Sequence, residues 1–256
     1  MSMTKEEYDV LLYGMIGLAV IVFIVLYYVN AGYGMFQSAR WGITINNRLG
    51  WIFMESPVFI IIFYFWVTSE RKFQLPFIIF FLLFELHYFN RSFIFPFMMK
   101  STSNMPVVIM CSAILFNFLN GTLQGEWIFR QSSTSQYDIS WMWTPYFIIG
   151  TIIFIIGMAI NLHSDWVIRN LREPGDTKHY LPEKGFYQYV LSANYFGEIV
   201  EWTGYALLSW SIAGAVFVLW TCANLIPRSN SIYRKYLDEF GPHRIGNRKR
   251  IIPFIY

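Results

Sequence analysis

Long apolar segments separated by short polar connections repeat along almost the whole chain. Segments of spanning length lie at about 10–29, 50–68, 74–98, 105–125, 141–162, 187–208 and 210–226. A membrane helix needs about 20 apolar residues, because each adds about 1.5 Å across a hydrocarbon core about 30 Å thick. The pattern predicts an all-α, polytopic membrane protein with seven transmembrane helices, formed as one domain over residues 1–256.

The two ends of this series differ from its middle. We predict that the first segment is a membrane helix and not a cleaved signal peptide, because Glu6, Glu7 and Asp9 outnumber Lys5 and no small-residue cleavage site follows. The last segment is short and follows the sixth across only residues 209–211. It forms either a full span or half of a tight hairpin, and the pattern leaves both open.

Composition supports a membrane protein, and the charges orient it. The 256 residues are 55% hydrophobic and 14% charged, whereas soluble domains are about 25% charged. The connections and the tail on the C-terminal side hold fourteen Lys and Arg residues, against four on the opposite side. The positive-inside rule then predicts a cytoplasmic C-terminus and an outside N-terminus. The membrane would be the inner membrane of a bacterium or the endoplasmic reticulum membrane of a eukaryote.

Polar residues inside the apolar segments gather at one predicted depth, about a third of the way in from the cytoplasmic side. Glu55, Tyr88 and Arg91 lie there on the second and third segments, and Asn161 ends the fifth. Ionisable groups within a bilayer are costly and usually mark a working site. We therefore expect one polar pocket that opens to the cytoplasm.

The richest polar stretch spans residues 161–201. Asn194, Glu198 and Glu201 recur there at i, i+4 and i+7, which places them on one helix face. Similar spacing relates three more residues if the fifth helix continues beyond its apolar part: Asp165, Arg169 and Arg172. Asparagines and acids can hold the nicotinamide and ribose of a nucleotide cofactor, and arginines can hold its phosphates. No histidine pair has metal-ligand spacing, so we predict no metal.

Each of these groups also has a purely structural interpretation. Glu55 can be a buried, protonated glutamate bonded to a neighbouring helix. Asn194, Glu198 and Glu201 can be polar contacts that hold helices together. The basic tail can serve only to bind anionic lipid headgroups.

Several motifs resemble one known family. NLHSDWVIRNLREPGD, ANYFGEIVEWTGYALLSWS and the terminal IIPFIY are similar to the C-terminal domain of the steroid 5α-reductases (3-oxo-5α-steroid 4-dehydrogenases). Three shorter motifs resemble earlier parts of that family: GYG at Gly32–Gly34, ESP at Glu55–Pro57 and LHYFNR at Leu86–Arg91. The resemblance covers most of the chain from about residue 31, and about 105–256 corresponds to the steroid-reductase-like, NADPH-binding part.

The resemblance implies a seven-helical enzyme that reduces the 4,5 double bond of 3-oxo-4-ene steroids to 5α-3-oxosteroids, by hydride transfer from NADPH to C5. Glu55 and Tyr88 match the catalytic pair that holds the 3-keto oxygen. The implied substrate-binding positions also include Trp51, Glu201 and Trp202. The implied cofactor-binding positions are Tyr33, Arg91, Asn161, Asp165, Arg169, Arg172, Asn194, Glu198, Arg228 and Tyr236.

Two other functions remain open at this point. One is reduction of a different lipid enone or enoyl substrate, such as a polyprenal or a long-chain enoyl thioester. The other is a non-catalytic sterol-binding membrane protein. The expected partners are a steroid-like lipid and the lipid bilayer, with no nucleic acid and no metal, and the chain is expected to be a monomer.

Overall fold

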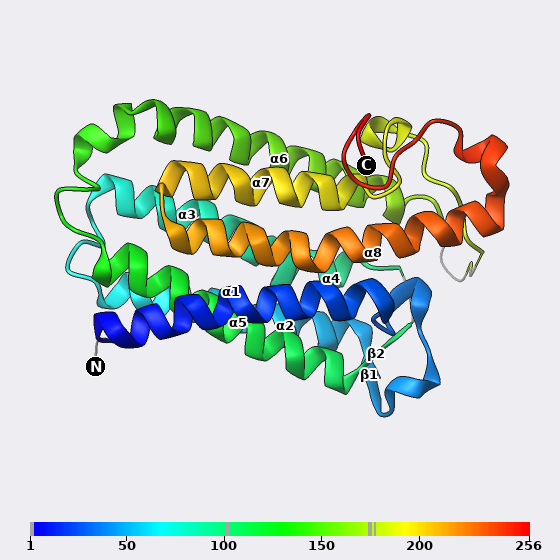
Figure 1. Ribbon diagram of the computed structural model, residues 1–256, viewed down its shortest axis with the longest axis horizontal. Coiled ribbons are helices and arrows are strands. Elements are labelled where there is room, and N and C mark those ends of the chain that lie inside the picture. Colours follow the sequence, from blue (N-terminus) through cyan, green and yellow to red (C-terminus); the bar gives the residue numbers. More distant parts are fainter. Residues whose placement is uncertain (1–2, 101–102, 174–175, 177) are drawn as a thin grey trace.

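The chain folds into a bundle whose helices run along one long axis (Figure 1). This computed structural model describes residues 3–100, 103–173, 176 and 178–256. Its α-helices are α1 (Lys5–Tyr28), α2 (Asn47–Thr68), α3 (Leu75–Phe89), α4 (Phe95–Met98), α5 (Val107–Glu126), α6 (Pro145–Arg169), α7 (Ala193–Ser209) and α8 (Ile212–Ile245). The N-terminal end of α1 lies at one end of the bundle, and the C-terminus lies near the other.

Shorter elements join these helices. The π-helix η3 (Asn90–Ile94) connects α3 to α4, and the π-helix η4 (Trp127–Gln131) extends α5. The 3₁₀-helices are η1 (Gly34–Phe36), η2 (Ala39–Trp41), η5 (Ile139–Trp143) and η6 (Gly185–Gln188). Strands β1 (Thr44–Asn46) and β2 (Asn104–Pro106) pair antiparallel. The all-α prediction missed this small sheet, because three-residue strands leave too short an alternating pattern to detect.

Six helical segments in the described part of the chain are long and apolar enough to cross a membrane. They correspond to α1, α2, the continuous run from α3 through α4, α5 with η4, α6 and α8. Helix α7 has only 17 residues, yet it packs between α6 and α8 in the bundle (Figure 1). The prediction of a mostly helical, multi-pass membrane protein is confirmed at this level.

The last helix is longer than its apolar pattern indicated. The predicted segment ended at 226, but α8 has 34 residues and continues through Pro227 to Ile245. It is therefore long enough for a full span, and Arg228, predicted at the exit of the helix, lies within it. The chain then turns back on the start of α7, where the Leu191 N–H donates to the Lys249 carbonyl at 2.9 Å. The predicted basic tail thus forms the second part of α8 and a C-terminal segment that packs back against the start of α7.

Helices α6 and α7 approach so closely that their backbones touch. A Cβ added at Gly157 on α6 would lie 2.1 Å from the backbone nitrogen of Glu201, and one at Gly197 on α7 would lie 2.5 Å from that of Asn161. Only glycine permits such an approach, as in small-residue interfaces between membrane helices. This contact fixes the register in which the polar ends of the two helices face each other.

The bounds of α6 and α7 follow from local signals that the apolar pattern does not contain. The Thr144 hydroxyl accepts from the Phe147 N–H at 3.3 Å, and Pro145 takes the first helical position, so α6 begins later than the predicted residue 141. The helix then continues to Arg169, as the spacing of Asp165 and Arg169 required. Helix α7 begins at Ala193 and not at 187, because residues 185–188 form η6.

Candidate functional site

One cavity of about 1150 Å³ opens among α1, α2, α3, α5, α6, α7, α8 and the connections at the C-terminal end of the bundle. It collects polar residues that lie far apart in the sequence. Twelve of the residues predicted for a site line it: Tyr33, Trp51, Glu55, Tyr88, Arg91, Asp165, Arg169, Arg172, Asn194, Glu198, Arg228 and Tyr236. Apolar side chains of α1 and α5, such as Leu18 and Leu115, line another part of the same cavity.

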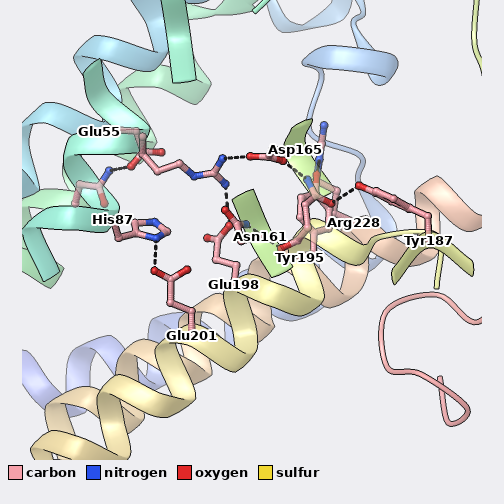
Figure 2. Close-up of polar contacts among 12 residues, drawn as sticks. Glu55, His87, Asn161, Asp165, Tyr187, Tyr195, Glu198, Glu201 and Arg228 are labelled. Carbon is pink, nitrogen blue, oxygen red and sulfur yellow. Dashed lines mark hydrogen bonds and ion pairs between the residues drawn. The ribbon is translucent and has the colours of Figure 1, made fainter. Parts of the chain in front are cut away.

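Glu55 and Tyr88 form one wall of this cavity. Glu55 lies on α2, where its Oε2 accepts a hydrogen bond from Asn117 Nδ2 at 3.2 Å (Figure 2). Tyr88 lies on α3, is 3% exposed and stacks on Phe84 with ring centroids 5.0 Å apart. Within the described residues, neither the Tyr88 hydroxyl nor Glu55 Oε1 has a protein hydrogen-bond partner, and both side chains line the cavity. The pair is therefore free to bind an oxygen atom of a ligand.

A second wall is built around Arg91, which the π-helix η3 places between α6 and α7. Its Nη1 donates to Asp165 Oδ2 at 3.0 Å and its Nη2 to Glu198 Oε2 at 2.8 Å. Asp165 Oδ1 accepts in turn from Asn194 Nδ2 at 3.0 Å. The Arg91 guanidinium also lies over the Trp51 ring at 5.4 Å. In Figure 2, dashed lines link Asp165 and Glu198 through the guanidinium group between them.

Arg228 is the cation on the opposite side of the cavity. Its Nε donates to the Tyr195 hydroxyl at 3.0 Å, its Nη2 donates to the Tyr33 carbonyl at 3.2 Å, and its guanidinium lies 3.8 Å from the Tyr33 ring centroid. Unlike Arg91, it forms no ion pair with a carboxylate in the described part of the chain. A cation held rigidly but without an acidic partner suits an anionic ligand group.

The mouth of the cavity carries further charge. Arg169 and Arg172 line it, with half-buried side chains and no carboxylate ion pair among residues that the structure describes. Beside them, the Lys178 backbone N–H and the Tyr180 hydroxyl donate to Asp176 and lower the pKa of its carboxyl, so it is ionised at neutral pH. Pro174 and Gly175 of the same motif lie outside the described residues.

Three predicted site residues do not line the cavity. Asn161 is 2% exposed and its Nδ2 donates to the Asn194 carbonyl at 2.9 Å, so it supports the wall of Arg91 without facing the cavity. Glu201 is fully buried and pairs with His87 Nδ1 at 2.9 Å. Trp202 is 1% exposed and packs on Phe217 in the core. Of the three residues predicted on one helix face, Asn194 and Glu198 line the cavity, whereas Glu201 lies about one turn further along α7 and does not.

Several residues contribute to the site without having been predicted for it. Asn117 and Tyr195 line the cavity and bond to Glu55 and Arg228, and buried His87 bonds to Glu201. Asn117 was detectable, because it is an isolated amide in an apolar segment. Tyr195 was not, because tyrosines are common at membrane interfaces. Among the described residues no group of three or more His, Cys, Asp or Glu side chains is placed to hold a metal ion.

Comparison with known proteins agrees with the motifs. The family model described as 3-oxo-5-alpha-steroid 4-dehydrogenase matches residues 103–256. The steroid 5-alpha-reductase DET2 of Gossypium hirsutum is 35% identical over 243 residues, which cover 93% of each chain. The 3-oxo-5-alpha-steroid 4-dehydrogenase 1 of Macaca fascicularis is 38% identical over 229 residues, covering 89% of this chain and 86% of the relative. The corresponding protein of Homo sapiens is 37% identical over 229 residues, covering 89% and 87%. The chain thus belongs to the 3-oxo-5-alpha-steroid 4-dehydrogenase family.

Proposed function

We propose that this protein reduces the 4,5 double bond of 3-oxo-4-ene steroids to 5α-3-oxosteroids, with NADPH as the hydride donor. The observation that supports the proposal is that one cavity has two chemically different walls. One wall presents the Tyr88 hydroxyl and Glu55 Oε1, which have no protein hydrogen-bond partner among the described residues. The other presents fixed charge, and apolar side chains of α1 and α5 line the space beside them.

The cavity suits a nucleotide cofactor together with a lipid. Its volume of about 1150 Å³ exceeds the roughly 300–1,000 Å³ typical of a site for one drug-sized ligand. Arg169, Arg172 and Arg228 line it without carboxylate partners among the described residues, which fits a group with phosphates, including the 2′-phosphate of NADPH. Asn194 and Glu198 add amide and carboxylate groups for a nicotinamide and ribose. NADPH supplies the hydride when it is bound.

The chain's own residues would hold and polarise the substrate. The Tyr88 hydroxyl and the acid form of Glu55 donate hydrogen bonds to the 3-keto oxygen. Negative charge builds on that oxygen as C5 is reduced, so these bonds strengthen in the transition state and lower the barrier. Trp51 and the apolar side chains of α1 and α5 exclude water and position the steroid rings.

The membrane arrangement belongs to the same proposal. Counting α7 with the six longer spans gives seven transmembrane helices, with the N-terminus outside and the C-terminus in the cytoplasm. The mouth of the cavity, near Arg172, would then face the cytoplasm, where NADPH is present. The protein would work as a monomer in the inner membrane of a bacterium or the endoplasmic reticulum membrane of a eukaryote, with residues 1–256 as one reductase domain.

A substrate panel on the purified protein tests the function. Protein in detergent is mixed with NADPH and either testosterone, a polyprenal or a long-chain enoyl thioester, and the loss of NADPH absorbance is recorded while products are identified by mass spectrometry. We expect stoichiometric conversion of testosterone to its 5α-dihydro product. Turnover of only the polyprenal or the thioester would replace the substrate class, and binding of testosterone without turnover of any compound would overturn the assignment as a reductase.

A further inference from the structure

Helix α5 presents a face of small and polar side chains to α2. A Cβ added at Gly121 would lie 3.1 Å from the Ile61 side chain, and one at Gly125 would lie 2.2 Å from the Phe65 ring. Asn117 lies one turn earlier on the same face, because residues at i, i+4 and i+8 align along a helix. The close approach of the two helices brings the Asn117 side chain, which is 3% exposed, against the backbone of α2.

The orientation of the Asn117 amide follows from its neighbours. Its Nδ2 donates to the Met54 carbonyl at 2.6 Å and to Glu55 Oε2 at 3.2 Å. A backbone carbonyl can only accept, so the atom facing Met54 must be the NH₂ group and not the amide oxygen. The second proton of that same NH₂ group then points at Glu55. Met54 therefore settles which end of the amide meets the glutamate.

This geometry distinguishes the two oxygens of Glu55. Oε2 accepts from Asn117, so it cannot also carry the acid proton toward that donor. Oε1 has no hydrogen-bond partner among the described residues, and Glu55 lines the cavity. We propose that Asn117 is a positioning residue for Glu55: it holds Oε2 as the acceptor and thereby places the acid proton on Oε1, facing the substrate. The inference rests on the proposed role of Glu55 toward the 3-keto oxygen.

The position of the acid proton on Glu55 matters for catalysis. An acid whose proton alternates between two oxygens spends part of its time unable to donate to the ketone. Fixing the proton on Oε1 removes that loss and holds the donor where charge develops in the transition state. A misplacement of about 1 Å in a catalytic group can cost about 100-fold in rate. Loss of Asn117 should therefore lower kcat more than it raises the KM for the steroid.

The test combines kinetics with infrared spectroscopy on the full-length protein in detergent. The variants are Asn117→Leu, which removes both donors at similar size, Asn117→Ala as a smaller alternative, Glu55→Gln, and the double variant. Asn120→Leu is the matched control, because Asn120 is a buried asparagine on the same helix whose Oδ1 accepts from Gln124 and which does not line the cavity. The acid C=O stretch of Glu55 is identified as the band that Glu55→Gln removes.

We expect Asn117→Leu to lower kcat for testosterone about 10-fold to 100-fold, and Asn120→Leu to leave it within a few-fold. In the Glu55→Gln background the same change should have little further effect, because the two residues act through one group. The Glu55 band should move to higher frequency in Asn117→Leu, since a hydrogen bond to the carbonyl oxygen is lost. An unshifted band, no acid band, or an undiminished loss in the Glu55→Gln background would overturn the inference. A parent protein that reduces no enone would instead overturn the proposed function.

Discussion

The two polar walls of the cavity differ in how completely the protein satisfies them. At the wall of Glu55 and Tyr88, a hydroxyl and a carboxyl oxygen face the cavity without protein partners in the described part of the chain. At the second wall, Arg91 uses both guanidinium arms on Asp165 and Glu198. Burying a polar group without a hydrogen-bond partner costs free energy. A ligand that bonds to Glu55 and Tyr88 would recover that free energy, whereas the hydrogen bonds of Arg91 are already made within the protein.

Polar groups therefore have two roles within one site: some hold the protein together, and others are available to a ligand. The paired wall is rigid before any ligand arrives, because each charge has a partner of opposite sign on another helix. The unpaired wall gains its partners only from a ligand, so its bonds can strengthen when charge develops on a substrate oxygen. Changes at the paired wall should therefore first affect folding, and changes at the unpaired wall should first affect turnover.

Arg91→Met should have the largest effect and would break the paired wall. It leaves Asp165 and Glu198 without their cation, and their side chains are only 10% and 17% exposed. Breaking a buried ion pair from one side costs about 3–5 kcal/mol. We expect a lower thermal unfolding temperature in detergent as well as weaker NADPH binding. Arg91→Lys, which keeps the charge, should recover part of the stability, and equal stability of Arg91→Met and the parent would contradict the comparison.

Tyr88→Phe and Glu55→Gln should come next, and they affect the other wall. Tyr88→Phe removes a donor to the keto oxygen, and Glu55→Gln replaces the acidic O–H with a weaker amide N–H donor, both with the shape preserved. Removal of one such donor costs on the order of 10²–10³ in rate. We expect each variant to unfold at the parent temperature and to bind NADPH normally, yet to lose at least about 100-fold in kcat for testosterone. The two losses should not add, because both residues act on one oxygen. A Tyr88→Phe enzyme within a few-fold of the parent would remove Tyr88 from the mechanism.

Helical periodicity was enough to predict the multi-pass bundle. Glu55, Tyr88 and Arg91, which were predicted at one depth, line one cavity, because an ionisable group in an apolar segment is a strong signal and helical rise is constant. Twelve of the residues predicted for a site line the cavity, and the family itself is confirmed.

Sequence patterns could not show where each side chain points. Glu201 and Trp202 share the motif of Glu198, but the close contact of α6 and α7 at Gly157 turns them away from the cavity. The length of α8 could also not be predicted, because the part after residue 226 is polar and contains Pro227 and Pro242. Tertiary contacts determine both the side-chain directions on α7 and the length of α8, and such contacts cannot be seen in a local sequence pattern.

Arg172→Ala should have a smaller effect, confined to the cofactor. The side chain is half-buried at the mouth and has no carboxylate ion pair among the described residues. A charge-assisted hydrogen bond contributes about 1.5–3 kcal/mol, so NADPH affinity should fall about 10-fold to 100-fold. Steroid affinity should change little. Calorimetry with NADPH and with NADH checks this, and the variant should lose most of the preference for NADPH. An unchanged NADPH affinity would show that Arg172 meets no phosphate.

Tyr195→Phe should have the smallest effect, because it loosens Arg228 without removing it. The substitution deletes the hydroxyl that accepts from Arg228 Nε at 3.0 Å, while the contacts of the guanidinium with the Tyr33 carbonyl and ring remain. Because the guanidinium stays in place on its remaining contacts, NADPH affinity should fall only about fivefold, which corresponds to about 1 kcal/mol. Tyr189→Phe is the control, since Tyr189 is 45% exposed and does not line the cavity. Calorimetry should show the loss in Tyr195→Phe alone. A loss as large as that of Arg228→Ala would mean that Tyr195 itself binds the cofactor, and no loss would mean that the contacts with Tyr33 and Ala31 are enough to hold Arg228.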